Sequence, residues 1–420
     1  LLLSSTVYAE DLKSTDANIV GHVIEKSTRE HLPYMTVSLK GTTIGTMTDA
    51  TGHYFLKNLP EGEFTLSVSA VGYKPQERKV ILKRGKTLEE NFELEEDMVA
   101  LDGVVVTANR NETARRLAPT LVKVVTPKLF DMTNSHTLSQ GLVFQPGVRV
   151  ENDCQNCGYS QVRINGMDGK YTQILIDSRP IFSALAGVYG LEQIPANMIE
   201  RVEVVRGGGS ALFGSSAIAG TVNIITKEPL RNSGSFAHSI SNFDGSGSFD
   251  NNTTLNLSLV SSDNKMGAYI YGQNRHRSAW DSNGDGFSEL PKLKNQTVGV
   301  NAYYRLSPYS KLNLEYHHME EFRRGGNRFD LPPHIAEDAN LNGSGEPGLV
   351  EQIEHSINTG GLKFSAFSKD QKHSFNAYAS AQHIVRDSYY SAYGHTTDFT
   401  GVLGAQYIYC LLYTSDAADD

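Results

Sequence analysis

The chain has 420 residues, a formal net charge of −9 and a mean hydropathy of −0.34. A transmembrane helix needs about 20 mostly apolar residues, whereas glycine and serine interrupt the longest uncharged stretch, Gly207–Thr226. The sequence therefore excludes helical membrane spans. It does not exclude a membrane β-barrel, whose strands of about 9 to 11 residues alternate polar with apolar side chains. The length predicts two or three domains, and the acidic charge gives no support to a nucleic-acid partner.

The two ends of the chain differ from the segments beside them. Residues 1–9 resemble the end of a signal peptide with its cleavage site after Ala9, so we expect an exported protein that begins near Glu10. At the other end an alternating pattern runs to Tyr409, and residues 410–420 continue neither that pattern nor its composition. We expect this last segment to be a non-native tail on a truncated chain.

Residues 17–95 alternate apolar and polar side chains in short runs that turn residues separate. The runs 19–24, 36–39 and 64–68 are predicted strands, and Gly52 supplies the positive φ that a tight turn between strands needs. This pattern predicts a small antiparallel β-sandwich, in which no catalytic arrangement is spelled out. The segment resembles the carboxypeptidase-D regulatory-like domain that precedes receptor modules in exported proteins of the Bacteroidetes.

A short β-prone run, residues 101–110, follows a charged joint. One interpretation is a further strand of the sandwich. The other is a segment that adds as a strand to a partner's sheet, where main-chain hydrogen bonds give the affinity. The run resembles a TonB box, by which the periplasmic protein TonB engages outer-membrane receptors. The resemblance assigns this role to Asp102, Gly103, Val104, Val105, Val106, Thr107 and Ala108.

Residues 111–228 contain the most specific sequence motifs in the chain. Ordered motifs in it are Gln145–Val148, Gln161–Gly166, Ile174–Asp177, Ile199–Gly214 and Ala219–Lys227. In this order and spacing they are similar to the plug domain of TonB-dependent outer-membrane receptors, and more to the siderophore, haem and cobalamin branch than to the glycan-importing branch. Read from the residues alone, the segment is a mixed α+β domain with β-branched strand runs.

Residues 232–409 alternate apolar and polar side chains with a period of two. Eight strands are predicted, at 235–243, 252–260, 266–280, 293–306, 311–322, 353–367, 373–386 and 397–409. Their connections alternate between short ones and long ones, the long ones being 281–292, 323–352 and 387–396. A transmembrane β-barrel has such short periplasmic turns and long extracellular loops. We therefore expect a mainly β protein, with a sandwich, an α+β plug and the first eight strands of a barrel of about 22 strands.

The first long connection has the spacing of a calcium-binding loop. Oxygen-bearing residues stand at its positions 1, 3, 5 and 9, a carbonyl ligand at position 7 and a glycine at position 6. These ligand candidates are Asp281, Asn283, Asp285, Phe287 and Glu289. Lys292 stands where a bidentate glutamate is expected, so a solvated turn is the alternative interpretation. Calcium would be structural here, and the predicted activity requires no other cofactor.

Two cysteines, Cys154 and Cys157, stand in a predicted plug loop. Because the periplasm is oxidising, we expect a small disulfide ring. A thiol pair that grips a metal or haem is the alternative, although two thiolates fall short of the four ligands of a zinc site.

The resemblance to plug domains also implies that loops facing the exterior help bind ligand. Candidates in this sequence are Asp153, Asn156, Tyr159, Arg179, Phe182 and Tyr189. Arg179 could pair with an anionic siderophore or another carboxylate, and aromatic side chains could contact a flat macrocycle.

The resemblance implies an outer-membrane receptor that imports a ferric siderophore or haem, with TonB and its inner-membrane motor complex as partners. The first domain and residues 101–110 would lie in the periplasm, outer-membrane lipid would surround the barrel, and a surface lipoprotein is a further partner that the family allows. A cobalamin receptor is the alternative within the family, and an exported β-rich adhesin or binding module is the alternative outside it. No nucleophile–base, paired-carboxylate or metalloprotease motif predicts an enzyme.

Overall fold

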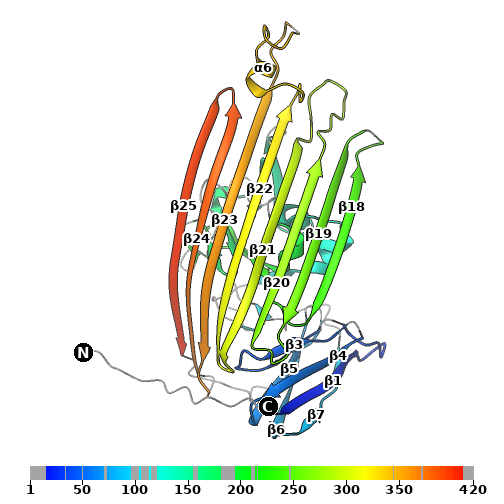
Figure 1. The fold of residues 1–420 in the computed structure, drawn as a ribbon, viewed down its shortest axis with the longest axis vertical. Helices are drawn as coiled ribbons and strands as arrows, with labels where there is room; N and C mark the ends of the chain where they lie inside the picture. The colour runs from blue at the N-terminus through cyan, green and yellow to red at the C-terminus, as the bar shows by residue number, and fades with distance from the viewer. Residues whose placement is uncertain are drawn as a thin grey trace, which may run out of the picture.

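The computed structural model describes residues 16–409 except 34, 50, 71–72, 96–103, 106–112, 115–120, 155–158, 181–193, 210–212, 215, 246, 344 and 370–371. These residues form three parts: an N-terminal domain, a small mixed domain, and a tall antiparallel sheet (Figure 1). No helix in the described part of the chain is long and apolar enough to cross a membrane.

The N-terminal domain is the predicted β-sandwich. One sheet contains β4 (His53–Leu59), β1 (Ala17–Glu25) and β7 (Thr87–Glu89), with β8 (Phe92–Leu94) also paired to β1. The other runs β3 (Gly45–Met47), β2 (Thr36–Leu39), β5 (Gly62–Ser69) and β6 (Gln76–Leu82). Alternate side chains of each strand enter a core between the sheets, where Ile19, Leu56 and Leu66 are fully buried. Period-two patterning is therefore what builds this domain.

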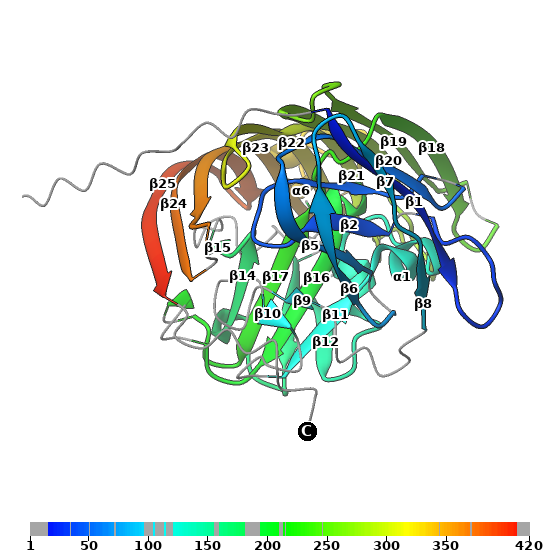
Figure 2. The ribbon, with the colours of Figure 1, turned by 90° about the horizontal axis from the view of Figure 1, so that it is seen from below.

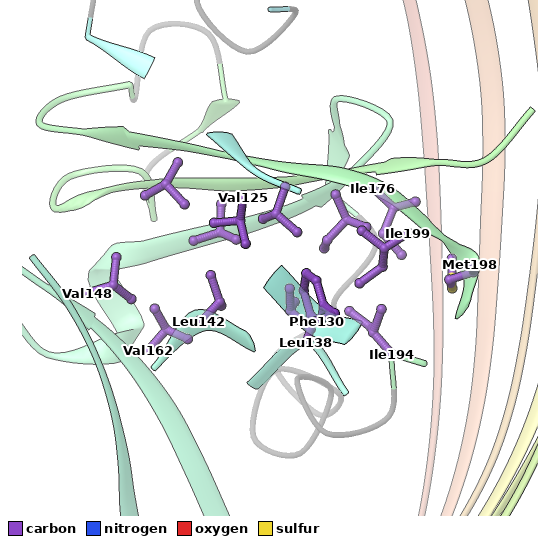
Figure 3. Packing of buried hydrophobic residues seen from close by; sticks show 14 of the residues in the cluster. Val125, Phe130, Leu138, Leu142, Val148, Val162, Ile176, Ile194, Met198 and Ile199 are labelled. Carbon is purple, nitrogen blue, oxygen red and sulfur yellow. The ribbon is translucent and has the colours of Figure 1, made fainter. Parts of the chain in front are cut away.

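The mixed domain has a five-stranded sheet in the order β11 (Val122–Val125), β16 (Ile199–Arg206), β17 (Gly220–Thr226), β14 (Thr172–Ile176) and β15 (Arg179–Pro180). Two short helices, α1 (Pro127–Met132) and α2 (Leu138–Leu142), and the hairpin of β12 (Val148–Cys154) and β13 (Tyr159–Ile164) complete it. Figure 3 shows Val125, Phe130, Leu138 and Ile199 meeting between the helices and the sheet. This confirms the α+β expectation.

The tall sheet has eight strands in sequence order, each antiparallel to the next. They are β18 (Ser233–Asn242), β19 (Phe249–Val260), β20 (Met266–Arg277), β21 (Lys292–Ser307), β22 (Ser310–Gly326), β23 (Val350–Phe367), β24 (His373–Tyr390) and β25 (Tyr393–Tyr409). All eight predicted strands are present. The β19–β20, β21–β22 and β23–β24 turns lie at the end near the N-terminal domain. The 278–291 and 327–349 connections lie at the other end, and the second carries α6 (Pro333–Glu337) (Figure 1).

The predicted long connection at 387–396 is wrong. Strand β24 continues to Tyr390 and β25 starts at Tyr393, so only two residues join them. Pairs such as Asp387 with His395 and Tyr389 with Tyr393 extend the ladder upward. The apolar pattern fades in this region because the side chains become polar or aromatic, but main-chain pairing does not depend on apolar side chains. The alternating pattern therefore predicts the end of the apolar band on these two strands, and the strands themselves extend beyond it.

The two faces of the tall sheet differ in polarity. The sheet curves around the mixed domain, which lies against its inner face (Figure 2). Inner side chains include Asn252, Gln273 and Thr297, all buried. The outer face carries exposed apolar side chains, which include Phe236 (70% exposed), Leu257, Val298, Leu314, Leu362, Phe399 and Leu403 (84% exposed). Exposed Tyr304, Phe375, Tyr407 and Tyr409 lie toward the short-turn end, as in the aromatic girdle of a membrane barrel.

The N-terminal domain contacts the short-turn end of the tall sheet through main-chain oxygens. The Thr43 N–H donates to the Pro308 carbonyl at 2.7 Å, in the turn between β21 and β22. The Thr46 hydroxyl donates to the Leu230 carbonyl at 3.4 Å, shortly before β18. The sandwich is thus held beneath the sheet by polar contacts.

One inner-face glycine leaves room for a tyrosine that joins the tall sheet to the mixed domain. A Cβ at Gly299 would lie 2.2 Å from the ring of Tyr271, which is 1% exposed and belongs to the mixed domain's hydrophobic cluster. We predict that Gly299→Ala displaces this ring and destabilises the chain by about 1–3 kcal/mol, as overpacking does. Chemical denaturation in detergent would measure the loss.

Gly272→Ala is the matched control for this substitution. Gly272 faces outward on β20, and a Cβ there meets no atom closer than 3.8 Å. Both substitutions add one methyl group to a strand, so the difference between them isolates the contact with Tyr271. Equal stability of the two variants would contradict the prediction.

Candidate functional site

A strained turn aims one arginine of the mixed domain at the tall sheet. The turn Asp177–Ser178 joins β14 to β15, and both residues have positive φ, 46° and 65°. Hairpin turns of this kind favour Asn-Gly, because few other residues adopt that conformation readily. Here side chains of β17 hold the turn. Thr226 donates to Asp177 from its main-chain N–H (3.0 Å) and its hydroxyl (2.8 Å), and Asn223 Oδ1 accepts the Ser178 N–H at 2.9 Å.

The next residue, Arg179, forms an ion pair with the wall. Its guanidinium donates to the carboxylate of Glu315 on β22 and lies 3.7 Å from Asp177 Oδ2. Burial works against the charge of Arg179, but Glu315 and Asp177 outweigh it, so the pKa of Arg179 is raised. Gly361 on β23 provides the space, because a Cβ there would lie 2.6 Å from the guanidinium. The ion pair therefore joins the mixed domain, the predicted plug, to the tall sheet, which forms the wall around it.

This geometry corrects the ligand-binding role predicted for Arg179. The residue is 3% exposed, and its charge is already matched by two carboxylates. An anionic ligand arriving from solvent would meet neither a free charge nor an open surface there. Sequence patterning did not find the partner, although Glu315 occupies a polar position of an alternating strand. Such a carboxylate on the inner face of a barrel is the signal that could have found it.

Further hydrogen bonds join the mixed domain to the inner face of the tall sheet. The Asn197 amide donates to Asn256 Oδ1 at 2.9 Å, and the Asn197 carbonyl accepts the Tyr269 hydroxyl at 2.9 Å. His136 Nε2 lies 3.1 Å from the Ser239 hydroxyl. Burial, and then the charge of Arg275, lowers the pKa of His136 although Asp250 opposes them.

Near the short-turn end, a more exposed ion pair links the mixed domain's exit to β22. Lys311 Nζ lies 3.0 Å from Glu228 Oε2 and 3.1 Å from Oε1. The Lys311 charge lowers the pKa of Glu228. Polar contacts therefore secure the domain to the wall at several heights, while Tyr271 adds an apolar one.

All of the other predicted ligand-binding residues lie outside the described residues or have no described side chain. Asn156, Phe182, Tyr189 and Cys157 lie outside. Asp153 and Cys154 fall in β12 and Tyr159 in β13, where the main chain alone is described. The predicted disulfide and the role of these loops therefore stay predictions.

Only two residues of the predicted TonB segment are described. Strand β9 (Val104–Val105) pairs antiparallel with β10 (Thr113–Ala114). Asp102, Gly103, Val106, Thr107 and Ala108 lie outside the described residues. The segment therefore has strand-forming main chain at its centre, which is a requirement for adding to a partner's sheet.

The predicted calcium loop has an ordered cluster of carboxylates. Oxygens of Asp281, Asp285 and Glu289 lie within 4.8 Å of one another. Main-chain N–H groups orient them: Asp281 accepts from Gly284 and Gly286, each at 2.7 Å, and Asp285 accepts from Phe287 at 2.8 Å. The structure thus brings three of the five predicted ligands together. The Asn283 amide nitrogen donates to Asp285 at 3.1 Å, and ligation by Asn283 and Phe287 stays a prediction.

Two family models match the chain. Residues 19–106 match the carboxypeptidase D regulatory-like domain, and residues 114–221 match the TonB-dependent receptor plug domain. Curated relatives include the vitamin B12 transporter BtuB of Vibrio vulnificus, 35% identical over 47% of this chain and 37% of that protein. The vitamin B12 transporter BtuB of Photobacterium profundum is 37% identical over 30% of this chain and 20% of that protein. The chain therefore spans well under half the length of these relatives.

Solved structures resemble the fold. The siderophore receptor PirA of Acinetobacter baumannii matches with a TM-score of 0.54 at 20% identity, over 68% of this chain and 44% of that one. A variant of the ferric enterobactin receptor of Pseudomonas aeruginosa matches with a TM-score of 0.56 at 19% identity, over 72% of this chain and 47% of that one. These relatives are named as transporters and receptors, none as an enzyme. The chain therefore contains a TonB-dependent receptor plug domain, which packs against an antiparallel sheet whose fold resembles that of the solved receptors.

Proposed function

We propose that the protein is an outer-membrane receptor that imports a scarce metal-chelate nutrient into the periplasm. One observation carries the proposal: a plug domain packs against the polar inner face of an antiparallel sheet whose outer face is apolar and exposed. An apolar outer face suits lipid, and a polar inner face suits a path for a hydrophilic cargo. Transport of this kind makes and breaks no covalent bond, so the proposal requires no catalytic residue.

The plug contacts suggest how a path could open. Hydrogen bonds such as those of Asn197 and His136 can be exchanged for hydrogen bonds to water at a small net cost each. A plug held mainly by such contacts can move under force without exposing a large apolar surface. In this proposal TonB supplies the force from the periplasm by pairing with the strand around Val104 and Val105.

The ligand class is part of the proposal. We propose a ferric siderophore or haem first, on the resemblance of the plug motifs to that branch of receptors. Cobalamin is the second candidate, because curated relatives at 35% and 37% identity are vitamin B12 transporters. Both classes are bulky metal complexes, which fits one gated path.

Uptake by cells that express the complete gene tests the proposal. We predict that these cells accumulate one of three labelled probes, a ferric siderophore, haem or cyanocobalamin. Replacing Val104–Ala108 with a Gly/Ser segment should abolish accumulation and leave surface binding intact, because binding does not need TonB. Accumulation should also require a functional TonB in the host.

The control replaces residues 83–86, the connection of the N-terminal sandwich between β6 and β7. Accumulation that survives loss of Val104–Ala108 would contradict the TonB mechanism. Binding of a probe without accumulation in any strain would favour an adhesin or binding module instead.

The Arg179–Glu315 pair makes a prediction about plug stability. Arg179→Met alone leaves the Glu315 carboxylate buried without its partner, which costs about 3–5 kcal/mol at such sites. The double variant Arg179→Met with Glu315→Leu should recover most of that loss. Denaturation of the wild type, the two single variants and the double variant in detergent gives the free energies of unfolding for this double-mutant cycle. The more exposed pair of Lys311 with Glu228 is the control, and Lys311→Met should cost under about 1 kcal/mol. Additive effects at Arg179 and Glu315 would contradict the coupling.

We also propose that the 281–289 loop binds calcium. Titration calorimetry with calcium should show one site that Asp281→Asn removes, because this carboxylate belongs to the cluster with Asp285 and Glu289. Asp244→Asn is a suitable control, since Asp244 lies in another connection of the same sheet. Equal heats from all three proteins would contradict the proposal.

A further inference from the structure

Three histidines lie together on the surface of the N-terminal domain. His22 on β1 pairs directly with His53 on β4, and His31 lies beside them in the connection after β1. Their ring centres are 5.2 Å (His22–His31), 5.8 Å (His22–His53) and 4.9 Å (His31–His53) apart. His31 and His53 are exposed, and His22 is partly buried. The cluster takes no part in the plug, the wall or the proposed calcium loop.

The ring spacing suits a shared metal ion. Two imidazoles bound to one tetrahedral ion, with nitrogens about 2 Å from it, have ring centres about 5 Å apart. Imidazole is a preferred ligand of zinc, copper and nickel. In the structure His31 stacks on His53 with an interplanar angle of 29°, so binding requires ring rotation. His31 is exposed and the χ2 preference of histidine is broad, so its rotation costs little.

Hydrogen bonds around His53 fix its tautomer. The Thr51 hydroxyl lies 2.6 Å from Asp49 Oδ1 and 3.0 Å from His53 Nδ1. An aspartate carboxylate only accepts hydrogen bonds, and Asp49 Oδ1 already accepts two main-chain N–H groups of the same turn. Thr51 has one hydroxyl proton and donates it to Asp49, so its oxygen accepts the proton on Nδ1 of His53. The lone pair of His53 is consequently on Nε2, the nitrogen left for a metal.

This arrangement is the kind that supports a metal ligand. A metal-binding histidine usually donates its other ring N–H to an anchored acceptor, which orients the ring and raises its basicity. The main chain of the turn is tied to the same carboxylate, since Asp49 Oδ1 also accepts the N–H groups of Thr51 at 2.8 Å and His53 at 3.0 Å.

We propose that His22, His31 and His53 bind one divalent transition-metal ion of the zinc class, with Thr51 as the residue that positions His53. The ion would connect β1, β4 and the segment between β1 and β2. The site is independent of the transported ligand.

Calorimetric titration of the chain with Zn²⁺ near neutral pH tests this proposal. Excess calcium would occupy oxygen-ligand sites, and Cys154, Cys157 and Cys410 would be changed to serine to remove thiolate ligands. We expect one zinc per chain, and we expect the double variant His31→Gln with His53→Gln to lose it. The control variant His238→Gln, which changes a histidine on the outer face of the tall sheet, should keep it. Circular dichroism would show that the variants fold. An unchanged zinc stoichiometry in the double variant would overturn the proposal.

Thr51 provides a test that keeps all three ligands. Thr51→Val removes the acceptor for His53 Nδ1–H, and we expect about 10- to 100-fold weaker zinc binding, as for other outer-shell partners. Thr51→Ser keeps the hydroxyl and should restore the affinity. Equal zinc affinity of the valine and serine variants would overturn the positioning role.

Discussion

The constraint on which the rest of the structure depends is the pairing of main-chain N–H and C=O groups across the tall sheet. In an apolar surrounding each unpaired group costs several kcal/mol, so strands that face lipid must form a continuous ladder. The ladder runs without interruption from β18 to β25. Because side chains alternate along each strand, the same ladder has two faces, and their polarities differ here. The apolar face points outward, and the polar face points toward the plug.

That polar inner face decides how the plug can be held. Charged groups taken out of water need partners, and the plug supplies one in Arg179 for Glu315. The arginine reaches its partner because the strained turn Asp177–Ser178 directs it there, and two side chains of β17 hold that turn. The plug sheet thus maintains the backbone strain of this turn, and the strained turn places Arg179 against the tall sheet. Tyr271 is an apolar contact among these polar ones, and its ring fits because Gly299 on the neighbouring strand has no side chain.

Periodicity predicted the elements well, and contacts between elements poorly. All eight strands of the tall sheet could be located because one face is apolar along most of their length. The hairpin between β24 and β25 was missed because its ladder continues where that apolar pattern ends. The role of Arg179 was missed because Glu315 is distant in sequence and meets it only through packing. The histidine cluster escaped notice similarly, since His22 and His53 become neighbours only through the register of β1 and β4. The carboxylates of the 281–289 loop were found because a single short segment contains them.

The order of strands in the plug sheet determines which part would yield first under the proposed mechanism. The predicted TonB segment precedes β10 and then β11. Among the described residues β11 is an edge strand, paired with β16 over four residue pairs. Strand β15, with Arg179, lies at the opposite edge of the same sheet. Force applied through Val104 and Val105 therefore acts first on the two-residue pairing of β9 with β10, and then on β11. Arg179, which pairs with Glu315 of the tall sheet, therefore lies on the strand of the plug sheet most distant from β11. A plug arranged in this way can open a path along one edge while the other edge stays attached to the wall.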